Sequence, residues 1–184
     1  MEETILDAEE RMQKSVGTMV DEFAAIRSGR ASAALFDKIR IEYYGEPTPL
    51  NQVATVSVPE ARLVVIQPWD KSVIGAIEKA IQKSELSVNP SNDGKVIRIN
   101  IPPLTEDRRK EIVKMAKNTA EQARIAIRNI RRNANDQLKK AQKDGEITED
   151  DIKRGEDEVQ KLTDAFVEKV DAALAAKEKE ILEV

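Results

Sequence analysis

The spacing of apolar residues changes along the chain and divides it into three helical stretches and one region of a different kind. Residues 4–27 carry a heptad-like seam, which is typical of a helix that packs lengthwise on other helices. Residues 105–143 carry apolar residues at intervals of three and four, which predicts one helix of about 57 Å. The stripe of this helix consists of Ile112, Ala116, Ala120, Ala123, Ile127, Ile130, Ala134, Leu138 and Ala141.

The last stretch of the chain predicts a third long helix. Thr148, followed three residues later by Asp151, is close to a capping box and marks its start. Its apolar face consists of Ile152, Val159, Leu162, Phe166, Val170, Leu174 and Ile181. The turn before it is short, so it is expected to pair antiparallel with the central helix. The first helix is then the remaining candidate to cover the open apolar flank of this pair.

Residues 30–104 differ from the helical stretches in composition, because they contain prolines and short runs of residues that favour β-strands. Alternation predicts strands near residues 39–43, 53–58, 63–66 and 95–101, the last with Val96 or Ile97 inward. The apolar positions of residues 70–84 predict a helix. Residues 45–49 and 89–94 are expected to be turns because they are rich in turn-forming residues. Trp69 is expected to pack in the core or at the edge of the domain.

These patterns together predict an α+β protein of two domains. Residues 1–29 and 105–184 are expected to form a long antiparallel three-helix bundle, and residues 30–104 a small inserted β/α/β domain. Only two segments of chain would join the two parts, so domain motion is expected at this junction. The hinge would consist of Gly29, Arg30, Pro103 and Leu104.

Composition narrows the chemistry. The chain has 184 residues, no Cys and no His, so disulfides, thiolate zinc sites and histidine bases are excluded. We expect no catalytic residue, no metal site and no cofactor. No apolar run is long enough to span a membrane, and the acidic first residues do not resemble a secretory signal. The expected location is therefore the cytoplasm.

The net charge of −4 conceals an uneven distribution. Residues 105–144 carry 12 Lys and Arg against 6 Asp and Glu, a net charge of +6, whereas residues 145–184 carry 6 against 13, a net charge of −7. The basic residues of the central helix form a stripe beside the apolar one. This stripe consists of Lys110, Lys114, Lys117, Arg124, Arg128 and Arg131.

The basic stripe has two interpretations. It can be an ordinary solvated face whose charges pair with acidic neighbours. Alternatively it binds an anionic partner, which is favoured by the density of Arg124, Arg128, Arg131 and Arg132 and by the presence of only one acid, Glu121, within a turn on that face. Guanidinium groups also suit phosphate. Two alternative functions are a helical adaptor for an acidic protein and a hydrolase with paired carboxylates. No convergent pair of carboxylates is visible in the sequence.

Several longer segments resemble the ribosome recycling factor family. The resemblance covers nearly the whole chain in matching order. The similar segments are residues 26–32 (IRSGRAS), 42–50 (EYYGEPTPL), 102–110 (PPLTEDRRK), 120–124 (AEQAR), 128–136 (RNIRRNAND) and 157–164 (DEVQKLTD).

This resemblance implies a fold, partners and site residues. The fold would be L-shaped, with a long three-helix bundle joined at a flexible elbow to a β/α/β domain. The protein would bind the large ribosomal subunit and its ribosomal RNA after termination and, with elongation factor G and GTP hydrolysis, split the ribosome. It would be a translation factor rather than an enzyme, acting as a monomer. The family's ribosome-contacting arginines correspond to Arg109, Arg128 and Arg131. Arg132, Arg124 and Lys117 lie close to them and complete the expected binding site.

Overall fold

The computed structural model describes residues 1–183, which fall into two compact units. The first, called the bundle, comprises Met1–Ile26 and Asp107–Glu183, and the second, called the insert, comprises Arg27–Glu106. The expected boundaries lay at residues 29 and 105, so the structure groups residues 27–29 with the insert. Within residues 1–183 no helix combines the length and apolar character needed to cross a membrane.

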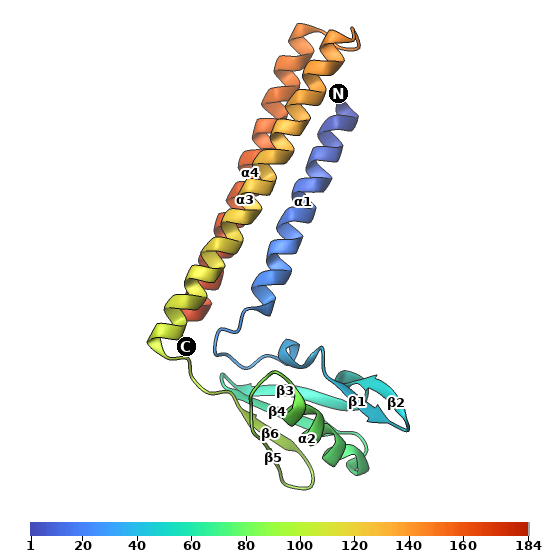
Figure 1. The fold of residues 1–184 in the computed structure, drawn as a ribbon, viewed down its shortest axis with the longest axis vertical. Helices are drawn as coiled ribbons and strands as arrows, with labels where there is room; N and C mark the ends of the chain where they lie inside the picture. Colours follow the sequence, from blue (N-terminus) through green and yellow to red (C-terminus); the bar gives the residue numbers. More distant parts are fainter. Residues whose placement is uncertain (184) are drawn as a thin grey trace. The chain divides into compact units, whose positions relative to one another are not determined.

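Three long helices form the bundle, and they lie alongside one another in Figure 1. They are α1 (Glu2–Ala25), α3 (Glu106–Lys143) and α4 (Glu149–Leu182). The predicted stripe of α3 is buried from Ile112 to Leu138, because its spacing keeps every member on one face of the helix. The seam of α1 is likewise buried at Met12, Val16, Met19 and Phe23, with Ala8 extending it.

Contacts between the helices fix their directions. Arg124 of α3 contacts Asp171 of α4, whereas Lys117, earlier in α3, contacts Glu178, later in α4, so the two helices are antiparallel as predicted. A Cβ added at Gly155 of α4 would lie 2.9 Å from the Leu138 Cδ1 atom and 3.3 Å from the Met1 Sδ atom. The three helices therefore pack closely at this glycine.

The start of α4 is fixed by the predicted capping box. The Thr148 Oγ1 atom accepts a hydrogen bond from the Asp151 amide at 3.1 Å, and the Thr148 amide donates to Asp151 Oδ2 at 3.0 Å. These two bonds satisfy amides that would otherwise lack partners at a helix start. The bond from the Thr148 amide to the Asp151 carboxylate is the largest cause that lowers the pKa of Asp151, followed by the hydrogen bond from Arg154.

The insert contains two antiparallel sheets and one longer helix, α2 (Ile74–Lys83), which follows a 3₁₀ turn at Lys71–Val73. The larger sheet has the strand order β3-β4-β6-β5, and β1 pairs with β2 separately (Figure 1). The strands are β1 (Arg40–Tyr43), β2 (Glu46–Pro49), β3 (Ala54–Glu60), β4 (Leu63–Pro68), β5 (Pro90–Asn92) and β6 (Ile97–Asn100). Short 3₁₀ turns also occur at Ala33–Phe36 and Leu50–Gln52.

The insert has an aliphatic core of its own. Its fully buried members include Val64 and Ile66 of β4, Ile77 of α2, and Ile97 and Ile99 of β6. The inward residue at the start of the last strand is thus Ile97, whereas Val96 is only partly buried. The fold class, α+β with a long three-helix bundle and a small inserted β/α/β unit, is confirmed.

Three expectations for the insert were wrong. Residues 46–49 form β2 rather than a turn, and Pro47 and Pro49 are tolerated because β2 has β1 as its only partner within the described chain. Residues 90–92 form the short edge strand β5. Trp69, expected to be packed, is 65% exposed, and its indole N–H donates to the Thr55 hydroxyl at 2.9 Å.

Candidate nucleic-acid interface

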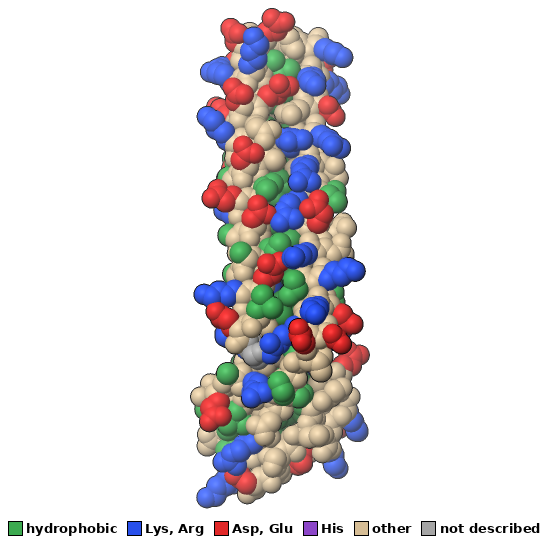
Figure 2. Space-filling view, turned by 90° about the vertical axis from the view of Figure 1, so that its left-hand side faces the viewer, with side chains coloured by type: hydrophobic (Ala, Val, Ile, Leu, Met, Phe, Trp, Pro, Cys, Tyr) green, Lys and Arg blue, Asp and Glu red, His purple; other side chains and the backbone are tan. Residues whose placement is uncertain are grey.

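The candidate site lies along one face of α3. We call it the basic face and define it as Lys117, Arg124, Arg128, Arg131 and Arg132. These residues share a face because α3 is one continuous helix in which each residue advances by about 100°. Since the buried stripe of α3 holds the helix against α1 and α4, the backbone that carries the basic face is rigid. Figure 2 shows Lys and Arg side chains along the bundle with Asp and Glu side chains between them.

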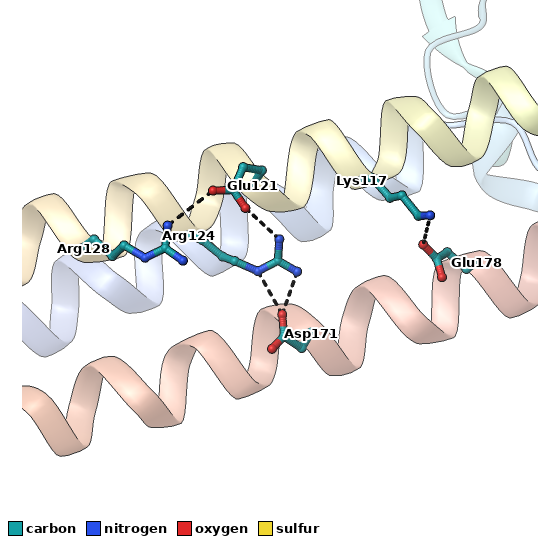
Figure 3. A network of polar contacts seen from close by, with 6 residues as sticks. All are labelled: Lys117, Glu121, Arg124, Arg128, Asp171 and Glu178. Carbon is teal, nitrogen blue, oxygen red and sulfur yellow. Dashed lines mark hydrogen bonds and ion pairs between the residues drawn. The ribbon is translucent and has the colours of Figure 1, made fainter.

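Arg124 is held between the two antiparallel helices (Figure 3). Its Nε and Nη2 atoms both donate to Oδ1 of Asp171, at 2.9 and 2.7 Å, and Nη1 donates to Glu121 Oε2 at 3.0 Å. The side chain is only 18% exposed. The hydrogen bonds to Asp171 are the main cause that raises the pKa of Arg124 above its usual value. Its charge is therefore permanent and already paired.

Arg128 is far less constrained than Arg124. One hydrogen bond, from Nη1 to Glu121 Oε1 at 3.3 Å, holds its guanidinium, and the side chain is 44% exposed. Glu121 thus lies between the two arginines, as Figure 3 shows. Ion pairs between exposed groups contribute only about 0–1 kcal/mol, so an incoming phosphate competes with a weak contact at Arg128.

The remaining members of the basic face differ in their contacts. Arg131 is partly buried and donates to Gln160 Oε1 of α4 at 3.5 Å, the limit of a hydrogen bond. Arg132 is exposed on the outer side of α3. The Lys117 ammonium lies 4.0 Å from Glu178 Oε1 (Figure 3). Arg128, Arg131 and Arg132 therefore keep guanidinium groups that a ligand can reach without breaking a strong contact.

The structure separates Arg109 from this group. It lies in the first turn of α3, about 28 Å along the helix from Arg128 at 1.5 Å per residue. Arg109 is partly buried, and its Nε atom is buried with no hydrogen-bond partner among residues 1–183. A buried donor without a partner is costly. Any anion that contacts Arg109 therefore does so at a separate point of the same helix.

The acidic partners supplied by α4 were missed in the sequence. Asp171 and Glu178 neutralise part of the basic face, although only Glu121 was recognised as a nearby acid. The available signal was the short turn at residues 144–145, because antiparallel pairing through that turn brings residues near 171 opposite residue 124. The structure thus realises the acid-paired interpretation fully at Arg124, whereas Lys117 and Arg128 make weaker ion pairs between exposed groups. It leaves the anion-binding interpretation open at Arg128, Arg131 and Arg132.

The predicted hinge residues lie in the segments that connect helices and strands. Gly29 has φ of +80°, a left-handed conformation that favours glycine. Pro103 and Leu104 lie between β6 and α3. The structure does not test their role as a hinge, which stays a prediction.

Arg124 and Arg128 are expected to differ in their effect on stability. Arg124→Ala should lower the free energy of unfolding by about 1–2 kcal/mol, because it removes the hydrogen bonds to Asp171 and Glu121. The loss should not be larger, since both carboxylates are exposed to solvent, which weakens each contact. Arg128→Ala is the matched control and should change it by less than about 0.5 kcal/mol. Urea unfolding followed by circular dichroism measures both values. An equal loss of unfolding free energy in the two variants would contradict this account, in which Arg124 stabilises the bundle and Arg128 does not.

The fold and the charged face together define a class: α+β proteins in which a long three-helix bundle with a basic face carries a small β/α/β insert. The model of the family described as ribosome recycling factor matches residues 19–182. The ribosome-recycling factor of Halalkalibacterium halodurans is 60% identical over 182 residues, covering 99% of this chain and 98% of that protein. That of Oleidesulfovibrio alaskensis is 58% identical over 184 residues, the full length of both chains. The chain belongs to the ribosome recycling factor family.

Solved structures agree with this assignment. A solution structure of a ribosome recycling factor is 43% identical and has a TM-score of 0.81, covering 100% of this chain and 97% of that chain. A second match, with 49% identity and a TM-score of 0.67, covers 98% of each chain. It belongs to models of the T. thermophilus ribosome recycling factor and the E. coli elongation factor G bound to the E. coli post-termination complex. A ribosome recycling factor is a translation factor and not an enzyme.

Proposed function

We propose that this protein binds the large ribosomal subunit after termination and, together with elongation factor G and GTP hydrolysis, splits the ribosome into subunits in the cytoplasm. The support is membership of the family, together with the related structure of a recycling factor bound with elongation factor G to a post-termination complex. In this proposal the bundle is the part that binds the large subunit, and the insert is the part on which elongation factor G acts.

The docking role is supported mainly by the exposure and the weak contacts of three arginines. Arg128, Arg131 and Arg132 lie on a rigid helix, and each is either exposed or held by a single long contact. The apolar stripe packs α3 without them. Guanidinium groups form paired hydrogen bonds with phosphate, so these three side chains supply a fixed row of phosphate ligands.

Shape and backbone charge are the expected basis of recognition. Structured RNA exposes phosphates and 2′-hydroxyls, whereas its deep major groove hides the base edges from side chains. A rigid helix with arginines at intervals of three and four residues fits such a surface. Arg124 contributes indirectly in this account, because its bonds to Asp171 and Glu121 hold α4 and Glu121 in place beside Arg128. Lys117, at 63% side-chain exposure, adds a weaker positive charge.

Sedimentation separates this proposal from its alternatives. The protein is expected to pellet with purified large subunits. Added elongation factor G and GTP should convert post-termination ribosomes into free subunits. Elongation factor G with a non-hydrolysable GTP analogue should not. An adaptor for an acidic protein would fail to pellet with large subunits. A protein that pellets but never supports splitting would retain the docking role and lose the recycling one.

A further inference from the structure

Two ion pairs between α3 and α4 follow the same register. Lys117 pairs with Glu178 at 4.0 Å. Arg124, seven residues later in α3, pairs at 2.7 Å with Asp171, seven residues earlier in α4 (Figure 3). Seven residues make nearly two helical turns, so each such step returns to the same side of both helices. A third ion pair is therefore expected one step further along the bundle.

The third step brings Arg131 of α3 opposite Asp164 of α4, yet no ion pair forms there. Within residues 1–183 the Arg131 guanidinium has one hydrogen-bond partner, the Gln160 Oε1 atom, at 3.5 Å. The Asp164 carboxylate also has one, the Gln160 Nε2 atom, which donates to Oδ1 at 2.8 Å. The side-chain amide of Gln160 thus contacts both groups that the register would otherwise pair with each other.

The chemistry of the two neighbours fixes the orientation of this amide. A carboxylate only accepts hydrogen bonds, so the nitrogen of Gln160 must face Asp164, and the oxygen is left for Arg131. Gln and Asp four residues apart on one helix form a favourable pair, and the 2.8 Å bond is short. The contact to Arg131, at 3.5 Å, is much weaker. Gln160 therefore holds the acid more firmly than it holds the arginine.

The other two acids of this register have no such neighbour. The residue four positions before Asp171 is Val167, and the one four positions before Glu178 is Leu174. Neither apolar side chain can donate a hydrogen bond, so both carboxylates are free to pair with α3. The result is clearest at Asp171, which accepts two hydrogen bonds from Arg124.

We propose that Gln160 is a positioning residue for ribosome binding, which withholds Asp164 from Arg131 and so keeps the Arg131 guanidinium available to a phosphate. This inference rests on the proposed function, in which Arg131 contacts ribosomal RNA. An arginine that is already paired with a carboxylate must give up that contact before it binds a phosphate. The difference between Arg124 and Arg131 is thus set by the residue that α4 places beside each acid.

Urea unfolding of the free protein tests whether Gln160 separates the two charges. Gln160 is exposed, so Gln160→Ala should stay folded. In the wild type, Arg131→Ala and Asp164→Asn should have nearly additive effects, because their side chains are not in contact. In Gln160→Ala the same two changes should become non-additive by roughly 2-fold to 5-fold in the unfolding equilibrium constant, the size of an exposed ion pair. Arg124→Ala and Asp171→Asn are the matched control and should be equally non-additive in both proteins.

Binding to purified large subunits at one salt concentration tests the consequence for the ribosome. Gln160→Ala should bind roughly 2-fold to 5-fold more weakly than the wild type, because a phosphate then competes with a new ion pair at Arg131. In a protein that already carries Asp164→Asn, the change Gln160→Ala should leave binding unaltered, since no carboxylate remains to capture Arg131. A direct contact between Gln160 and RNA would instead cause the same loss in both backgrounds.

Three results would overturn the proposal. They are additive effects of the two changes in Gln160→Ala, an equal loss of binding whether or not Asp164→Asn is present, and wild-type binding by Gln160→Ala when Arg131→Ala binds more weakly. Failure of the proposed function has a different signature. Arg131→Ala would then bind as the wild type does, and the positioning role would fall with it, whereas the unfolding result for the free protein would stand.

Discussion

A chain in which residues 27–105 are replaced by a short Gly-Ser link is expected to bind large subunits and to lose ribosome splitting completely. The bundle should fold without the insert because its buried residues belong to α1, α3 and α4, and the core of the insert is separate. The basic face stays intact, since every member lies in α3. Splitting should disappear because the part through which elongation factor G acts in the proposal has been removed.

Circular dichroism, co-sedimentation and a subunit-splitting assay measure this prediction together. The same shortened chain carrying Arg131→Glu is the matched control, and it should fold equally well and fail to bind. A shortened chain that is unfolded would contradict the independence of the bundle. A shortened chain that still splits ribosomes would contradict the role given to the insert.

Arg131→Ala is expected to weaken binding to large subunits by about 1–3 kcal/mol, roughly 5-fold to more than 100-fold in the dissociation constant. The side chain would lose a charge-assisted contact to phosphate, whereas in the free protein it gives up only a 3.5 Å hydrogen bond to Gln160. The melting temperature should therefore stay close to that of the wild type. Arg131→Glu should bind more weakly still, because repulsion is added to the lost contact.

Lys161→Ala controls for the loss of one positive charge from the bundle. Lys161 is exposed and lies on α4, so it is not a member of the basic face of α3, and its removal should change binding by less than about 0.5 kcal/mol. Filter binding or fluorescence anisotropy gives the dissociation constants, and thermal melts show whether each variant is folded. A loss of binding that merely follows unfolding would assign Arg131 a structural role.

The bundle was predictable because its signals are local and repeated. The apolar stripe from Ile112 to Leu138 extends over many helical turns, so one polar residue within it would not obscure the helical spacing. The capping box at residues 148–151 requires only neighbouring residues. The insert was harder to predict, because its strands are short and some contain proline. Pro47 and Pro49 indicate a turn in the sequence, yet they lie in a strand because pairing on one side only leaves their missing N–H groups without consequence.

The common face of the arginines on α3 was predictable from the sequence, whereas their pairing with acidic residues was predictable only in part. The spacing of Arg124, Arg128 and Arg131 shows that they share a face. It does not show that Asp171, 47 positions away from Arg124, takes two of its hydrogen bonds. That contact depends on the register between α3 and α4, a property of three-dimensional packing. Glu121 was the easier partner to recognise, because it lies on the same helix as the arginines that it contacts.

The salt dependence of binding tests the central claim, that α3 docks on RNA phosphates, most directly. Each phosphate neutralised by an arginine releases counterions, so the logarithm of the binding constant should fall linearly with the logarithm of salt concentration. For the wild type we expect a steep slope. For Arg131→Ala we expect a slope smaller by about one phosphate contact. Parallel lines for the two proteins, or wild-type binding that does not change with salt, would contradict the claim.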